Sequence, residues 1–78
     1  MPTVFRKGNL RFFFYSREET RRHIHIISPD GTGKFWLEPY IELANSVGLT
    51  KKDLTTANDI INIKHKDFID AWNKHFTL

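Results

Sequence analysis

The stretch that decides the fold is residues 23–38, "HIHIISPDGTGKFWLE". Its first five residues alternate histidine with β-branched isoleucine, which is typical of a strand whose two faces differ. The cluster "SPDGTG" at residues 28–33 consists of turn-forming residue types, and "KFWLE" then returns to strand character. We therefore predict two antiparallel strands joined by a tight turn.

The residues that precede this stretch predict a second hairpin. "TVFRKGN", residues 3–9, indicates a short strand that ends in a turn, and "LRFFFYS", residues 10–16, has the aromatic enrichment of a strand. The charged stretch "REETRR", residues 17–22, connects this hairpin to the next strand. The predicted sheet has three to four antiparallel strands.

The residues that follow the stretch are less uniform. Pro39 lacks a backbone N–H, so we expect the strand from Lys34 to stop or bulge there. Residues 39–49 stay unassigned, because their apolar residues fit the spacing of a helix as well as that of a strand.

The clearest helical pattern begins after Thr50. This residue is followed three positions later by Asp53, which resembles a capping box. An apolar stripe at helical spacing continues to the C-terminus and consists of Leu54, Ala57, Ile60, Ile61, Phe68, Ile69, Trp72 and Phe76. Residues 64–66, "KHK", interrupt the stripe, so either two helices meet there or one long helix has a polar gap. We predict one α+β domain over residues 1–78, an antiparallel sheet packed on one face by C-terminal helices.

Alternation along the strands assigns side chains to the two faces of the sheet. One face is wholly apolar and is the predicted core: Phe12, Phe14, Ile24, Ile26, Phe35 and Leu37. The opposite face mixes aromatic rings with cationic or titratable groups: Arg11, Phe13, Tyr15, His23, His25, Lys34 and Trp36. This second face is the predicted functional surface, provided that no bulge shifts the register.

Composition limits the classes of function. The chain has 78 residues, a formal net charge of +3, seven Phe, two Trp, two Tyr and no cysteine. The absence of cysteine excludes disulfides and thiolate chemistry and fits a reducing cytoplasm. The N-terminal residues have no signal-peptide pattern, and no apolar stretch approaches the roughly 20 residues of a membrane helix. We expect a cytoplasmic protein that does not bind membranes, with a mild positive charge compatible with nucleic acid or an acidic protein partner.

Two kinds of chemistry fit the histidine pair. As neutral imidazoles, His23 and His25 could bind one metal ion, but no third ligand is evident, so we predict neither a metal nor a cofactor. Alternatively, the pair could act as base and acid in RNA cleavage, with Arg22 or Lys34 stabilising the charged phosphate. Histidine titrates near neutrality, which suits that role.

A binding function makes wider use of the same face. Phe13, Tyr15 and Trp36 would stack on bases while Arg11, Arg22, Lys34 and the histidines contact phosphates, as on other aromatic platforms for single strands. The same residue types anchor protein interfaces. In a purely structural alternative, another part of the chain covers this face.

Four segments together resemble the bacterial family known as domain of unknown function 4160: "MPTVFRKGNLRFFFYS", "HIHI", "GKFWLEP" and "AWNKHF". Family members usually carry two prolines before the first histidine, where this chain has Arg21 and Arg22. The resemblance implies a small α+β domain without an assigned activity, and genes in modules of the toxin–antitoxin kind, hence a small protein partner and RNA or DNA. It draws attention to His23, His25, Lys34, Phe35 and Trp36 without giving them roles.

From these patterns we predict a binding module for a protein partner or single-stranded nucleic acid. The alternative is a small ribonuclease-type toxin with His23 and His25 as its acid and base. Oligomeric state is not predicted.

Overall fold

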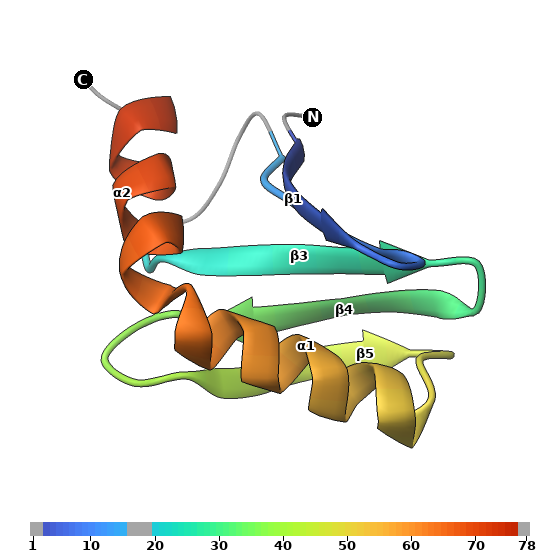
Figure 1. Cartoon of the computed structure of the whole chain (residues 1–78). Helices are drawn as coiled ribbons and strands as arrows, with labels where there is room; N and C mark the ends of the chain where they lie inside the picture. The colour runs from blue at the N-terminus through green and yellow to red at the C-terminus, as the bar shows by residue number, and fades with distance from the viewer. Residues whose placement is uncertain (1–2, 16–19, 77–78) are drawn as a thin grey trace.

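The computed structural model describes residues 3–15 and 20–76, which form an antiparallel sheet and two helices (Figure 1). The strands are β1 (Thr3–Lys7), β2 (Leu10–Phe13), β3 (His23–Ser28), β4 (Gly31–Trp36) and β5 (Glu42–Val47). Each strand pairs with the next one along the chain, so the order in the sheet is β1-β2-β3-β4-β5. The predicted α+β class is confirmed. Ser16, the last residue of the predicted second strand, and residues 17–19 of the charged connection lie outside the described residues.

The described sheet has five strands, so the prediction of three to four was wrong. The additional strand is β5, which lies within the unassigned residues 39–49. Its pairing with β4 is irregular: Lys34 lies opposite Asn45, whereas the next residue, Phe35, lies opposite Leu43. One extra residue, Ala44, therefore interrupts the ladder as a β-bulge. Because a bulge breaks the two-residue alternation, the apolar residues of β5 show no clean strand period in the sequence.

The helices are α1 (Lys51–Ile63) and α2 (His65–His75). Thr50 is the N-cap of α1, and its side-chain hydroxyl accepts a hydrogen bond of 3.0 Å from the backbone N–H of Asp53. The predicted interruption at residues 64–66 is the junction of two helices rather than a polar gap in one. Lys64 ends α1 and precedes α2.

The core lies between the helices and one face of the sheet. All six predicted core side chains are at most 3% exposed. They join one cluster with Leu10 of β2 and with buried residues of both helices, namely Ala57, Ile61, Phe68 and Trp72. Aromatic contacts connect the two layers: the ring centroids of Phe12 and Phe68 are 5.7 Å apart, and those of Phe14 and Trp72 are 5.4 Å apart. Each such fully buried side chain contributes about 1.5–3 kcal/mol.

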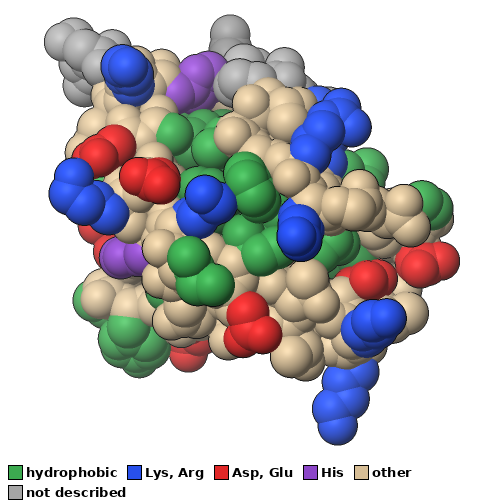
Figure 2. All heavy atoms as spheres, in the orientation of Figure 1, with side chains coloured by type: hydrophobic (Ala, Val, Ile, Leu, Met, Phe, Trp, Pro, Cys, Tyr) green, Lys and Arg blue, Asp and Glu red, His purple; other side chains and the backbone are tan. Residues whose placement is uncertain are grey.

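The helices cover the sheet unevenly. In Figure 1, α1 lies over β4 and β5, and α2 stands across the end of the sheet, near the β1–β2 hairpin. Figure 2 views the molecule from this helical side and shows hydrophobic side chains still visible near its centre, beside Lys and Arg side chains. A cation–π contact joins the β1–β2 hairpin to the junction of the helices: the Lys64 ammonium lies 4.8 Å from the centre of the Phe5 ring.

Two glycines allow the chain to pass from β5 into α1. Gly48 has a positive φ of 83°, which L-residues with a side chain rarely adopt, and a Cβ there would overlap the carbonyl oxygen of Asp30. A Cβ on Gly31 would overlap the carbonyl oxygen of Val47. The turn between β3 and β4 therefore lies directly against the residues that precede α1, which positions the start of that helix.

Candidate functional site

The sheet face opposite the core carries a row of side chains that crosses four strands. Strand pairing places Phe13 of β2 opposite His25 of β3, His25 opposite Lys34 of β4, and Lys34 opposite Asn45 of β5. Paired residues of an antiparallel sheet project to the same side. We call this surface the open face and define it by Arg11, Phe13, Tyr15, Arg21, His25, Thr32, Lys34, Trp36, Glu42 and Asn45. Glu42 lies opposite Trp36 and forms a 3.8 Å ion pair with Arg21.

Three rings on the open face form one packed group. The rings of Phe13 and His25 are stacked with centroids 5.6 Å apart, and Tyr15 contacts His25 edge-on at 4.4 Å. Phe13 is only 2% exposed, whereas Tyr15 is 44% exposed. Phe13 is therefore a support beneath the surface, and Tyr15 presents a ring that a ligand can contact.

Cationic side chains lie against two rings of this face. The guanidinium carbon of Arg21 is 4.0 Å and the ammonium nitrogen of Lys34 is 4.3 Å from the centre of the Trp36 ring. Arg11 lies 5.1 Å from the centre of the Phe13 ring. Cation–π contacts of this kind contribute about 0.5–1 kcal/mol at exposed positions. They therefore favour positions of the charged groups at the surface, but weakly enough that a ligand can displace them.

His23 differs from His25 in its surroundings. Its ring contacts the rings of His25 and Trp36, which places His23 on the predicted side of β3. At this end of the strand, however, other side chains cover the imidazole ring. Trp72 of α2 packs against it with ring centroids 5.1 Å apart, and His23 is 1% exposed. The expectation that both histidines lie on an accessible surface is thus wrong for His23. Its Nδ1 is 2.8 Å from the backbone carbonyl oxygen of Arg21, an oxygen that can only accept, so Nδ1–H donates.

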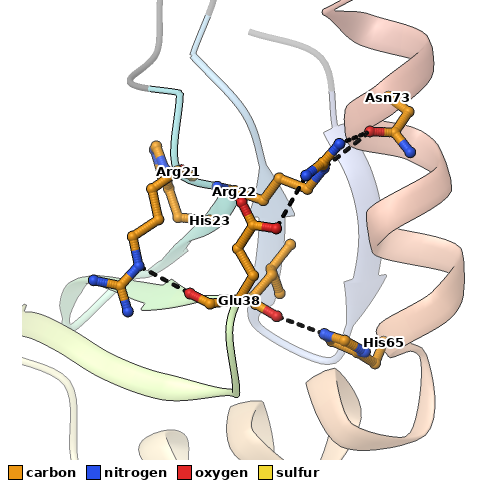
Figure 3. A network of polar contacts seen from close by, with 7 residues as sticks. Arg21, Arg22, His23, Glu38, His65 and Asn73 are labelled. Carbon is orange, nitrogen blue, oxygen red and sulfur yellow. Dashed lines mark hydrogen bonds and ion pairs between the residues drawn. The ribbon is translucent and has the colours of Figure 1, made fainter.

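Arg22 lies away from the open face, contrary to its predicted place among the phosphate-contacting residues. Figure 3 shows it directed toward α2, whereas Arg21 points to the other side. Its guanidinium forms a 3.0 Å ion pair with Glu38 and donates two hydrogen bonds, of 2.9 and 2.7 Å, to the side-chain oxygen of Asn73. We call Arg22, Glu38 and Asn73 the latch, because they connect the start of β3 and the end of the β4 segment to α2.

The latch affects the titration of Glu38. A hydrogen bond from the backbone N–H of Arg22, at 3.1 Å, is the main cause that lowers the pKa of this carboxyl, and the side chain and charge of Arg22 act in the same direction. Next to the latch, Nε2 of His65 lies 2.7 Å from the carbonyl oxygen of Leu37 (Figure 3). The His65 contact connects α2 to the segment that follows β4, and the latch connects α2 to Arg22 through Asn73, so both are structural.

A recess of about 210 Å³ opens within the row. Its lining includes the rings of Phe13, Tyr15 and His25 on one side and the polar side chains of Thr32, Lys34 and Asn45 on the other. A concave site with apolar walls and a few convergent polar groups has the usual character of a ligand-binding site, although this one is smaller than a drug-sized pocket.

Residues 3–15 and 20–76 contain no group of three His, Cys, Asp or Glu side chains that could hold an ion. In the same ranges, none of the helices is long and apolar enough to span a membrane.

Sequence reasoning missed four residues of the open face: Arg21, Thr32, Glu42 and Asn45. Arg21 has the same parity as His23 and His25, so alternation alone would have selected it instead of Arg22. Thr32 was counted as part of a turn, but it is a residue of β4 opposite Ile27. Asn45 could not be found, because its orientation depends on the bulge at Ala44.

The chain is thus a small α+β protein with one helix-covered sheet face and one aromatic and basic face. It matches the family described as domain of unknown function 4160 (DUF4160) over residues 9–73, which is most of its length, and it belongs to that family. The predicted resemblance is confirmed. No curated protein and no solved structure matched the chain.

Proposed function

We propose that the protein is a binding module whose open face holds single-stranded RNA. The observation that carries the proposal is the alternation of rings and cations on this face, where Arg21 and Lys34 lie within 4.3 Å of the Trp36 ring centre. Single strands are bound by such surfaces, because bases stack on rings and phosphates meet the cations.

The sequence-based prediction gave Phe13, Tyr15 and Trp36 the same role, stacking on bases. The contacts of the open face indicate different roles for these three rings. Tyr15, at 44% exposure, is the ring best placed for stacking. Trp36 is already in contact with two cations, so its main role is to hold Arg21 and Lys34 at the surface. A guanidinium plane can itself stack on a base, which gives Arg21 a second means of contact.

The ribonuclease alternative is weaker for a geometrical reason. General acid–base cleavage needs both catalytic groups within hydrogen-bond reach of the substrate, and His23 is 1% exposed. We therefore do not propose catalysis by the histidine pair. A place in a module of the toxin–antitoxin kind, and a small protein partner, stay predictions from the family resemblance.

The test is binding of a fluorescein-labelled mixed-sequence RNA of about twelve nucleotides, within the usual site sizes of single-strand binding proteins. Fluorescence anisotropy at about 50 mM KCl, followed by a salt titration, gives affinity and its dependence on counterion release. Tyr15→Ala should weaken binding about 5- to 150-fold, equivalent to about 1–3 kcal/mol for one stacked base. Lys34→Gln should reduce the slope of log K against log salt by about 0.7.

Lys52→Gln is the matched control, because Lys52 is an exposed lysine of α1 in the helical layer. It should bind RNA as the wild type does. RNA length is followed by gel electrophoresis in the same samples. The proposal fails if the wild type does not bind RNA at low salt, which would leave the open face to a protein partner. It also fails if all variants bind equally, and RNA cleavage lost in His25→Gln would favour the enzyme instead.

A further inference from the structure

The recess in the open face has two walls of different chemistry. One wall is aromatic: Tyr15 lies edge-on to His25 at 4.4 Å, above the buried Phe13 ring. The opposite wall is polar and comes from β4 and β5, with Thr32, Lys34 and Asn45. Ile26 and Gly33 complete the lining between the walls. A ligand that satisfies both walls is planar on one surface and carries hydrogen-bonding groups along one edge.

The volume limits the ligand to one small unit. At about 210 Å³ the recess is below the roughly 300–1,000 Å³ of sites for drug-sized molecules, so it has room for one ring system. A nucleobase fits this description, since it offers a π-face for stacking and an edge with donors and acceptors. The attached phosphate would meet Lys34, which borders the recess and lies on the adjacent Trp36 ring.

The bulge in β5 supplies the residue that can read a base edge. In a regular strand Asn45 would project to the same side as Leu43, two residues earlier. Instead, Leu43 pairs with Phe35 and lines a groove with Leu54 of α1 on the helical side, whereas Asn45 pairs with Lys34 on the open face. Bulges commonly redirect a side chain beside a functional site.

We infer that the recess binds one base of the bound strand and that Asn45 determines which base is preferred. This inference rests on the proposed RNA-binding function and extends it from affinity to specificity. The asparagine amide combines donors and an acceptor, so it makes paired hydrogen bonds to a base edge that presents a complementary set. Stacking on Tyr15 accepts any base, so discrimination falls to the polar wall. There Lys34 can only donate and Thr32 has a single hydroxyl, whereas the planar amide of Asn45 offers a donor and an acceptor side by side.

The experiment compares the affinities of wild-type protein for labelled oligo-A, oligo-C and oligo-U of equal length. One bidentate pair corresponds to a discrimination of about five-fold or more between the best and the worst base. In Asn45→Ala the three affinities should become nearly equal. Asn58→Ala is the matched control, because Asn58 is exposed on α1 at the helical side, and it should keep the wild-type ratio. Differences in self-stacking between the oligonucleotides affect all three proteins equally and cancel in this comparison.

Four outcomes overturn the inference, and they differ in what they say of the proposed function. If the wild type binds all three strands equally and with salt dependence, RNA binding stands and base recognition falls. If Asn45→Ala keeps the wild-type ratio, the recess does not discriminate through this residue. If an unlabelled nucleoside monophosphate competes as well as a full strand, the ligand is a free nucleotide. Absence of binding to every strand removes the proposed function as well. Circular dichroism and urea unfolding of Asn45→Ala should match the wild type, because the side chain is exposed.

Discussion

The two faces of the sheet use the same kinds of residue in different ways. On the core face, Phe12 and Phe14 pack against Phe68 and Trp72 of α2. On the open face, Phe13 is buried just as deeply, but its cover consists of side chains from the sheet itself, including Arg11, Tyr15 and His25. A second layer of secondary structure is therefore not required to bury a ring, because long amphipathic side chains can do so.

Because of this difference, the core face contributes mainly to the stability of the fold, whereas the open face is accessible to a ligand. Helices held by apolar contacts cannot leave without unfolding the core, whereas exposed side chains that lie on rings can move to meet a ligand at small cost. The two faces are therefore expected to respond differently to substitution, and four predictions test this expectation.

The largest expected effect comes from truncating a ring on the core face. Phe14→Ala should lower the free energy of unfolding by about 3–5 kcal/mol, because the side chain is 1% exposed and leaves a cavity beside Trp72. Urea denaturation followed by circular dichroism measures the effect.

The neighbouring Tyr15→Ala is the matched control for Phe14→Ala. It removes an adjacent aromatic side chain from the opposite face, where Tyr15 is 44% exposed, and should cost only about 0.5–1.5 kcal/mol in lost ring contacts. Equal losses in the two variants would contradict the distinction between the faces.

The core face could be predicted from the sequence because only local information was needed. Alternation within single strands identified six core residues of the sheet but not Leu10, and the Thr50 cap follows from a side chain and a backbone N–H three residues apart. The bulge at Ala44 depends on the pairing of β5 with β4 and leaves no local pattern. The place of Arg22 depends on Asn73, 51 residues further along the chain.

A second prediction concerns how α1 is held over the core face. Gly48→Ala and Gly8→Ala both place a side chain at a positive φ, which costs about 1–2 kcal/mol for an L-residue. At Gly8 the added Cβ meets no atom within 4 Å, whereas at Gly48 it would overlap the carbonyl oxygen of Asp30. Gly48→Ala should therefore lower the urea midpoint more than Gly8→Ala does. The reverse order would show that the close approach of the two turns is not maintained in solution.

The third prediction compares His23 with His25. The ring of His23 contacts both His25 on the open face and Trp72 of α2. His23→Ala removes a buried ring that contacts Trp72 and leaves the Arg21 carbonyl oxygen without its donor, which should cost about 1–3 kcal/mol. His25→Ala should cost less, because His25 is only partly buried. For RNA binding we expect the opposite order: when only the folded fraction of each variant is counted, His25→Ala should lose more affinity than His23→Ala. Loss of RNA affinity in a stably folded His23→Ala, with none in His25→Ala, would show that the buried ring belongs to the binding surface.

The difference between these histidines was not readable from the sequence. Both occupy the same side of one strand, and the residue that buries His23 is Trp72, far along the chain on α2. The apolar stripe correctly assigned Trp72 to the core, but the stripe contains no information about where α2 crosses the sheet. Contacts such as the latch contribute to that crossing, and of its three residues only Arg22 had a predicted role, as a phosphate contact.

The smallest expected effect is a pH dependence that arises from the latch, which connects α2 to the start of β3 and the end of the β4 segment. Hydrogen bonds from Arg22 lower the pKa of Glu38 in the folded protein relative to the unfolded chain. A carboxyl with a lowered folded-state pKa contributes stability that is fully present above about pH 4.5 and is lost as the pH falls through the folded-state value. Because Arg22 and Glu38 are about one-third exposed, solvent screening keeps this contribution small.

Urea midpoints of the wild type and Glu38→Gln at several pH values between 7 and 3 measure this contribution, and the wild type should lose more stability below pH 4.5 than the variant does. Asp70→Asn is the matched control, because Asp70 forms an exposed ion pair with Lys66 on α2, and it should leave the acid dependence nearly unchanged. Parallel acid curves for wild type and Glu38→Gln would mean that the latch does not stabilise the charged carboxylate, and that α2 is held by contacts independent of this charge, such as the His65–Leu37 hydrogen bond and the apolar core.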